Sequence, residues 1–190
     1  MIKIAFSGAQ GTGKTTILNR VTEMLIKDGK TVKVLPELIR ECPYPADAES
    51  TFSTQLWVSS QTILYETELG KEIDYLIADR PITDIAVYKE LVRENRGLSD
   101  TEDKILSFLI ETWRVTYDLF FAVTVPVEIW MERDIDDGFR STDPKIYNFL
   151  TERFAGVVPE NAYHIENIDL EESVQKVYNI IKGFTPDSAH

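Results

Sequence analysis

The segment Gly8–Thr15 has the sequence Gly-Ala-Gln-Gly-Thr-Gly-Lys-Thr, which matches the G-x-x-x-x-G-K-[ST] pattern of a phosphate-binding loop. An apolar run, Ile2–Phe6, precedes it as an expected buried strand, and an expected helix, Thr15–Asp28, follows it. A glycine-rich turn at a helix N-terminus presents backbone N–H groups and the positive end of the helix dipole to an anion. We therefore expect Lys14 to reach the β- and γ-phosphates of a nucleoside triphosphate and the Thr15 hydroxyl to ligate Mg²⁺.

Composition restricts the remaining choices. The chain has 190 residues, of which 43% are hydrophobic, enough for one buried core and too few for two ordinary domains. The net charge of −12 argues against a dedicated nucleic-acid binder, because such binding depends on Lys and Arg, although a local basic cleft stays open. A single cysteine, Cys42, excludes an intrachain disulfide, and the histidines show no zinc-ligand spacing. With no signal peptide and no apolar run of membrane-spanning length, we expect a cytoplasmic protein.

Strand-like and helix-like segments alternate along the chain without a break in composition. After the first strand, apolar runs predict four more strands, Thr31–Leu35, Tyr75–Ala78, Leu119–Val125 and Ala162–Ile165. Helices are expected over Thr51–Leu69, from Ile82 to about Arg93, after the capping box Ser99–Glu102, and from near Pro144 and Asp169. This alternation predicts an α/β fold, a parallel sheet with helices on both faces and ligands at the carboxyl ends of the strands. We expect one domain over residues 1–184 and a frayed tail over 185–190.

Polar residues follow two of the expected strands. Glu37 and Arg40 come after the second strand, and Asp79 and Arg80 end the third. We expect Asp79 to lie beside the triphosphate, where it would hold Mg²⁺ through water or orient the acceptor hydroxyl, and Arg80 to face the transferring phosphate. The alternatives are a strand-end turn with a surface ion pair for Asp79 and Arg80, and a solvated acid for Glu37.

The expected helix over Thr51–Leu69 offers a second kind of contact. Trp57, Gln61 and Leu64 share a face at helical spacing, so the indole could stack on a base while the amide reads its edge. The alternative places Trp57 in the core and Gln61 at its margin. Trp113 and Trp130 are expected in the core.

A segment over about residues 131–143 carries several aspartates between Arg133 and Arg140. An arginine-bearing segment after the fourth strand is typical of a phosphoryl-transfer lid, because guanidinium groups match phosphate oxygens and closure excludes water. The alternative is an acidic surface loop whose arginines neutralise its own aspartates.

These features together resemble the small P-loop nucleoside and nucleotide kinases, most closely the ribosylnicotinamide kinase domain of the bifunctional NAD-biosynthesis regulator. The resemblance is carried by Gly8–Thr15, the Glu-x-x-Arg-Glu of Glu37–Glu41, Asp79, and the Asp-Asp-Gly-Phe-Arg-Ser of Asp136–Ser141. It implies a five-stranded parallel sheet in the order 2-3-1-4-5, use of ATP with Mg²⁺, and catalytic roles for Lys14, Glu37, Asp79, Arg80 and Arg140. It implies nucleotide contacts from Gly8, Gln10, Gly11, Thr12, Gly13, Lys14, Thr15, Thr16 and Arg133.

One departure concerns the acceptor. Asp79-Arg80-Pro81 is more similar to the Asp-Arg or Glu-Arg of thymidylate and deoxynucleoside kinases. That resemblance implies a small-molecule acceptor, either a nucleoside with Glu37 as base for its hydroxyl, or a nucleoside monophosphate held by Arg40 and Arg80. Trp57 and Gln61 complete the expected substrate contacts. A homodimer is one possible assembly of the chain.

Other users of a phosphate-binding loop fit less well. A regulatory GTPase would need an Asn-Lys-x-Asp guanine reader, which the sequence lacks, and a motor ATPase usually has a second carboxylate where Arg80 stands. A non-catalytic nucleotide sensor stays open. So does a kinase acting on a hydroxymethylated base in DNA, although the acidic composition disfavours it.

Overall fold

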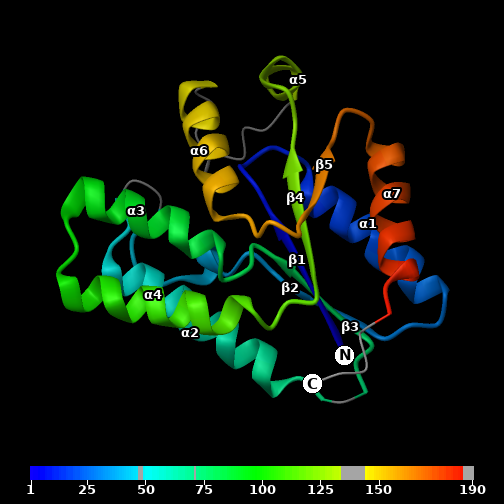
Figure 1. The fold of residues 1–190 in the computed structure, drawn as a ribbon, viewed down its shortest axis with the longest axis horizontal. Coiled ribbons are helices and arrows are strands. Elements are labelled where there is room, and N and C mark those ends of the chain that lie inside the picture. Colours follow the sequence, from blue (N-terminus) through cyan, green and yellow to red (C-terminus); the bar gives the residue numbers. More distant parts are fainter. Residues whose placement is uncertain (47–48, 71, 134–143, 186–190) are drawn as a thin grey trace.

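The structure, a computed structural model, describes residues 1–46, 49–70, 72–133 and 144–185. Strands and helices alternate along nearly all of this chain (Figure 1). In chain order the elements are β1 Ile2–Ser7, α1 Lys14–Lys27, β2 Val32–Leu35, the 3₁₀ turn η1 Leu38–Glu41, α2 Phe52–Glu68, β3 Tyr75–Asp79, α3 Asp84–Arg96, α4 Asp100–Arg114, β4 Leu119–Thr124, α5 Val127–Glu132, α6 Pro144–Val157, β5 Tyr163–Glu166 and α7 Leu170–Gly183.

The five strands form one parallel sheet in the order β2-β3-β1-β4-β5, which confirms the fold predicted from the sequence and its family resemblance. The order places β1 at the centre, between β3 and β4. The register pairs Phe6 of β1 with Asp79 of β3, so Asp79 ends its strand level with the start of the loop after β1. All five carboxyl ends therefore open at one edge of the sheet, where ligands of such folds bind.

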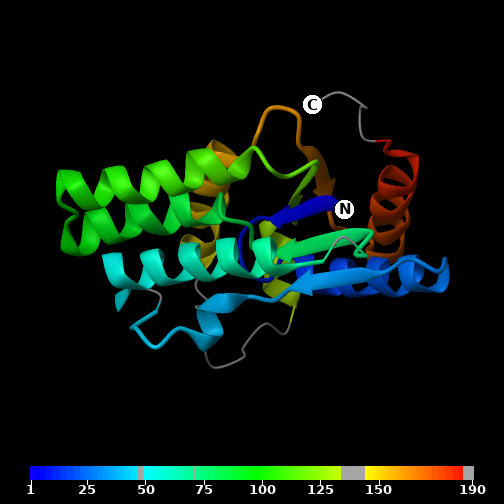
Figure 2. The same cartoon turned by 90° about the horizontal axis from the view of Figure 1, so that it is seen from below.

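Helices cover both faces of the sheet. On one face α1 and α7 pack together over alternating strand residues such as Ile4, Phe6 and Phe121, all with no exposed surface. On the other face α2, α3 and α4 form a layer, visible from the side in Figure 2. Leu76 and Ala78 of β3 point into this second core. Alternate residues of the inner strands β1, β3 and β4 thus serve opposite cores, which explains why these strands are continuous apolar runs, whereas the edge strand β5 is mostly exposed.

Local sequence signals account for several helix starts. Ser99 accepts the backbone N–H of Glu102, whose carboxylate in turn accepts the Ser99 N–H, so the expected capping box is confirmed. Thr51 and Thr54 form a similar reciprocal cap at the start of α2. The short helix α5 was not predicted from the sequence. The expected lid segment, 131–143, begins inside α5, and only residues 131–133 of that segment are described. None of the helices in the described ranges combines the length and apolarity needed to cross a bilayer.

Candidate functional site

The loop between β1 and α1 has a backbone that depends on glycine. Gly8 has φ +139°, and a Cβ atom there would lie 2.2 Å from the Val123 carbonyl oxygen of the neighbouring strand β4. Gly13 has φ +87°, and a Cβ atom there would lie 2.3 Å from the Asn167 side chain. Both positions combine a left-handed backbone with a close approach that no other residue can make. The glycines of the motif therefore set the shape of the loop.

Lys14 folds over this loop and is only 5% exposed. Its Nζ donates to the carbonyl oxygens of Gly8 at 2.8 Å and Ala9 at 2.7 Å. Burial, and then the positive charge of Arg80, lower the pKa of Lys14 to about 7. Neighbouring carboxylates, Asp79 first among them, oppose this shift. The Lys14 side chain is thus fixed at the loop, in surroundings where a bound anion would stabilise its positive charge.

Thr15 and Asp79 lie side by side at the N-terminus of α1. The Thr15 hydroxyl donates to Asp79 Oδ2 at 2.5 Å, and the parallel pairing of β1 with β3 brings the carboxylate to this position. A hydroxyl and a carboxylate are hard oxygen donors of the kind that Mg²⁺ prefers. These two residues therefore fit the predicted metal site. Thr16 follows in the same first turn and is exposed.

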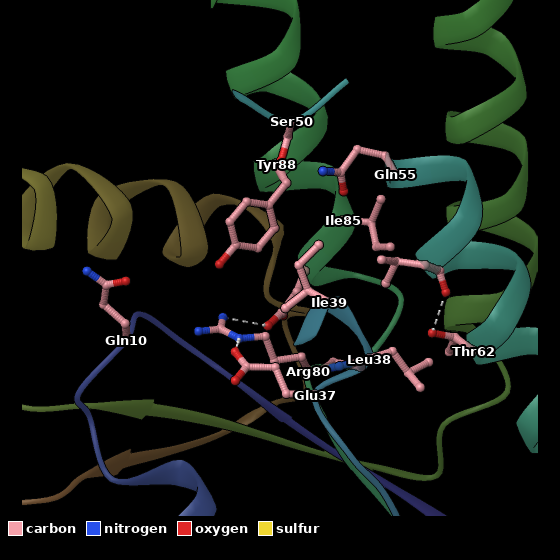
Figure 3. A pocket seen from close by; sticks show the side chains of 13 residues that line it. Gln10, Glu37, Leu38, Ile39, Ser50, Gln55, Thr62, Arg80, Ile85 and Tyr88 are labelled. Carbon is pink, nitrogen blue, oxygen red and sulfur yellow. Dashed lines mark hydrogen bonds and ion pairs between the residues drawn. The ribbon is translucent and has the colours of Figure 1, made fainter. Parts of the chain in front are cut away.

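Arg80 and Glu37 lie in contact with each other beside the phosphate-binding loop (Figure 3). Arg80 Nε donates to Glu37 Oε1 at 2.7 Å, and Arg40 Nε donates to Glu37 Oε2 at 2.9 Å. Arg80 also donates to the Gly8 carbonyl oxygen at 3.3 Å, which ties it to the phosphate-binding loop. It is the only non-glycine residue with a positive φ, +72°, in the described part of the chain. Burial alone would lower the pKa of Arg80, but Tyr88, Glu37 and Asp84 raise it above its ordinary value, so the guanidinium stays charged.

Asp84 is a site residue that the sequence analysis missed. It is the first residue of α3, is 2% exposed, and accepts a short hydrogen bond from the Ser7 hydroxyl at the end of β1. Its other oxygen lies 3.5 Å from Arg80 Nη1. Burial raises the pKa of Asp84 to about 6, although Arg80 and Ser7 act in the opposite direction. The only sequence signal was its spacing of four residues after Arg80, which reads equally well as an ordinary helix-start acid.

A pocket opens beside the loop, between η1, α2 and α3 (Figure 3). It is lined by Gln10, Glu37, Leu38, Ile39, Ser50, Gln55, Val58, Thr62, Arg80, Pro81, Asp84, Ile85 and Tyr88. Helix α2 contributes its Gln55–Val58–Thr62 face. Trp57 and Gln61, expected as substrate contacts, are not among the lining residues: at 100° per residue, Trp57 lies about 130° and Gln61 about 90° around the helix from the centre of this face. Gln55 is the amide of α2 that lines this pocket, and substrate contacts from Trp57 and Gln61 stay a prediction.

Residues after β4 and β5 hold the phosphate-binding loop from the other side. Arg133 Nη1 donates to the Gly11 carbonyl oxygen at 3.1 Å, and its Nη2 donates to the Asn167 carbonyl oxygen at 2.7 Å. Asn167 Nδ2 donates to the Thr12 carbonyl oxygen at 2.8 Å, while its buried Oδ1 has no hydrogen-bond partner among the described residues. Trp130, which is 1% exposed as expected of a core residue, donates its indole N–H to the Gln10 carbonyl oxygen at 3.0 Å. Arg133 is therefore in contact with the loop, while its contact with the nucleotide stays a prediction, and Asn167 is an addition.

Two other expectations have different outcomes. Trp113, also expected in the core, is half-buried and donates its indole N–H to Glu66 at 2.9 Å. Arg140 and most of the expected lid, residues 134–143, lie outside the described residues. The role of Arg140 stays a prediction.

The fold and the loop together define a P-loop nucleotide-binding protein, with a complete phosphate-binding loop at the carboxyl edge of a 2-3-1-4-5 parallel sheet. A family model described as an AAA domain matches residues 3–176. The match extends over most of the chain, which therefore belongs to this AAA-domain family. No curated protein matches the chain in sequence.

Solved structures with the same fold include several kinases. Deoxyadenosine kinase from M. mycoides with bound dATP has a TM-score of 0.70 at 16% identity, with 96% of this chain and 100% of that chain covered. The same enzyme with the products dCMP and dCDP has a TM-score of 0.67 at 17% identity, covering 97% and 100%. Thymidylate kinase from Candida albicans has a TM-score of 0.67 at 14% identity, covering 95% and 91%. At these identities the similarity shows the fold.

Proposed function

We propose that the protein is an ATP-dependent kinase that transfers the γ-phosphoryl group to a nucleoside or nucleoside monophosphate. The observation that carries this proposal is the position of the pocket, which shares Gln10 with the phosphate-binding loop and is joined to it by the contact of Arg80 with Gly8. An acceptor in this pocket would lie next to the terminal phosphate of a nucleotide on the loop. Phosphoryl transfer depends mainly on such positioning and on charge stabilisation.

Each residue of the site has a role in this proposal. Lys14 would hold the terminal phosphates, and Thr15 with Asp79 would hold Mg²⁺, which would supply positive charge to offset that of the phosphates. Glu37 would accept the proton of an attacking hydroxyl, and Arg80 would orient Glu37 while facing the transferred group. The kinases with a similar fold act on nucleosides and nucleotides, which supports this substrate class.

The test is a screen of ribonucleosides, deoxyribonucleosides, nicotinamide riboside and their 5′-monophosphates with ATP and Mg²⁺, measured as acceptor-dependent ADP release. We expect at least one acceptor to be phosphorylated, and Lys14→Ala to abolish the reaction. Lys14→Ala should also lose most of the increase in melting temperature that ATP gives the parent, because ligand stabilisation follows affinity. Equal ATP-induced shifts in both proteins would refute the role of the loop. Tight ATP binding with no acceptor-dependent ADP release would instead favour a nucleotide sensor.

A further inference from the structure

The proposed function gives no role to Asp84, although its side chain lines the pocket and is almost wholly buried. The carboxylate is fixed on two sides, by the Ser7 hydroxyl at the end of β1 and by Arg80 Nη1 at 3.5 Å. A buried carboxylate is costly unless it is paired, so its presence in a ligand pocket calls for a reason.

Both arginines near the pocket are already engaged with carboxylates. Arg80 is held by Glu37 at 2.7 Å and by Asp84 at 3.5 Å, and its side chain is only 12% exposed. Arg40 pairs with the other oxygen of Glu37 at 2.9 Å, from a more exposed position. In the described part of the chain, these are the two guanidinium groups beside the pocket that could hold the phosphate of a nucleoside monophosphate.

The charge balance of the pocket follows from these pairs. Its lining contains two carboxylates, Glu37 and Asp84, against the single guanidinium of Arg80, a formal charge of −1. Adding Arg40, which binds Glu37 from outside the lining, only brings this balance to zero. A further cation, Lys14, is directed at carbonyl oxygens of the phosphate-binding loop. A phosphomonoester carries about −1.5 to −2 charges at neutral pH, and the described residues of the pocket offer it no surplus positive charge.

We propose that the acceptor is an uncharged nucleoside, and that Asp84 is the residue that excludes the corresponding 5′-monophosphate. Asp84 does so by occupying Arg80 and by placing a second negative charge beside the position of the acceptor. This inference rests on the proposed kinase function and makes its substrate class specific. Because burial raises the pKa of Asp84 only to about 6, the carboxylate remains mostly ionised above neutral pH.

The rest of the pocket suits a neutral ligand. Figure 3 shows Tyr88 and Gln55 directed toward the space above Arg80 and Glu37. Apart from Asp84, the other lining groups are all neutral, either polar, such as Ser50 and Thr62, or apolar, such as Leu38, Ile39, Val58 and Ile85. Sites for small neutral ligands are mostly apolar with a few placed hydrogen-bonding groups, as this one is.

The experiment compares the dissociation constants of the best nucleoside acceptor and of its 5′-monophosphate by calorimetry, in three proteins. These are the parent, Asp84→Asn, and Glu68→Gln, a matched control that removes one negative charge from an exposed position of α2. We expect the parent to bind the nucleoside at least about ten-fold more tightly than the monophosphate. Asp84→Asn should reduce this ratio by about ten-fold, because one buried like charge is removed, and Glu68→Gln should leave it unchanged.

The outcomes separate this inference from the proposed function. A parent that phosphorylates the monophosphate more efficiently than the nucleoside would overturn the inference and leave a kinase. A parent that releases no ADP with any acceptor would overturn the proposed function itself. An unchanged ratio of the two dissociation constants in Asp84→Asn would show that Asp84 does not select the nucleoside over its monophosphate. If this variant does not fold, the parent decides the acceptor class alone: a monophosphate that the parent binds as tightly as the nucleoside would refute exclusion.

Discussion

Lys14 carries its charge in surroundings that disfavour it until an anion arrives. Burial and the Arg80 charge lower the pKa of Lys14 to about 7, and bound phosphates would raise it again. At about pH 8 the free amine is then mostly neutral, so binding of ATP with excess Mg²⁺ should take up close to one proton. Calorimetry in two buffers with different ionisation enthalpies measures this uptake.

A matched variant isolates the amine. Lys14→Arg keeps a cation at the loop, but arginine does not titrate in this range, so the uptake should disappear. The same uptake in both proteins would mean that another group takes the proton. No uptake in the parent would mean that Lys14 is fully charged before ATP binds.

Glu37 tests the nature of the acceptor at the level of one residue. If Glu37 accepts the proton of a nucleoside hydroxyl, Glu37→Gln should lower kcat by about 10²–10⁴. Steady-state kinetics at saturating ATP and acceptor would measure this loss. Glu41→Gln, which neutralises an exposed acid four residues along the same turn, is the control and should retain activity. A Glu37→Gln enzyme with kcat near that of the parent would exclude the general base, as expected only for an acceptor that is already ionised.

At the scale of the elements, the sequence predicted the positions of strands and helices, because these depend on local patterns of apolar residues and caps. All five strands and the main helices lie within a few residues of their predicted positions, because each has an apolar run or a cap. The strand order came from the family resemblance, since strand patterns alone carry no order. The α2 residues that line the pocket, Gln55, Val58 and Thr62, differ from the Trp57 and Gln61 that the sequence pattern favoured. Gln55 and Thr62 are buried polar residues while Leu64 is 49% exposed, so the helix lacks a clean apolar stripe that would mark its faces. The contact of Asn167 with the loop joins residues 155 apart in sequence, which no local pattern reports.

The loop after β5 makes a prediction at this scale. Asn167 binds the Thr12 carbonyl oxygen and is held by Arg133, so two elements remote in sequence clamp the phosphate-binding loop. Asn167→Ala leaves a buried carbonyl oxygen without its donor, a change worth about 1–3 kcal/mol. We expect KM for ATP to rise by about ten-fold, kcat to change little, and amide exchange within Gly8–Thr15 to become faster.

Amide exchange gives this prediction its control. Exchange in α7, which begins just after Asn167, should stay at the parent rate if only the loop is loosened. Asn167→Asp keeps the shape of the side chain but cannot donate, so it should weaken ATP binding at least as much as Asn167→Ala. A KM for ATP at the parent value in both variants would show that the clamp is not needed for nucleotide binding.

Over the whole molecule, the parallel sheet brings distant residues to one edge. Lys14 and Thr15 follow β1, Glu37 follows β2, and Asp79 and Arg80 lie at the end of β3. These three segments are separated by tens of residues in the sequence. Such convergence could be predicted once the sheet was predicted to be parallel, because every strand then ends at the same edge. Which side chains pair at that edge could not be predicted, because the pairing of Arg80 with Glu37 and Asp84 depends on a left-handed backbone at Arg80.

The net charge of −12 leads to the last prediction, which separates a small acceptor from a polynucleotide. A protein that contacts 6–10 phosphates of DNA loses about 10³–10⁵ in affinity between about 50 and 200 mM salt, because counterions are released on binding. A neutral nucleoside releases none. We therefore expect its KM to change by less than about two-fold over this range, measured at saturating ATP and constant free Mg²⁺. A duplex oligonucleotide bearing hydroxymethylated bases should neither be phosphorylated nor inhibit nucleoside phosphorylation at low salt. Phosphorylation of that oligonucleotide with a steep loss on adding salt would instead establish a polynucleotide kinase with a local basic cleft.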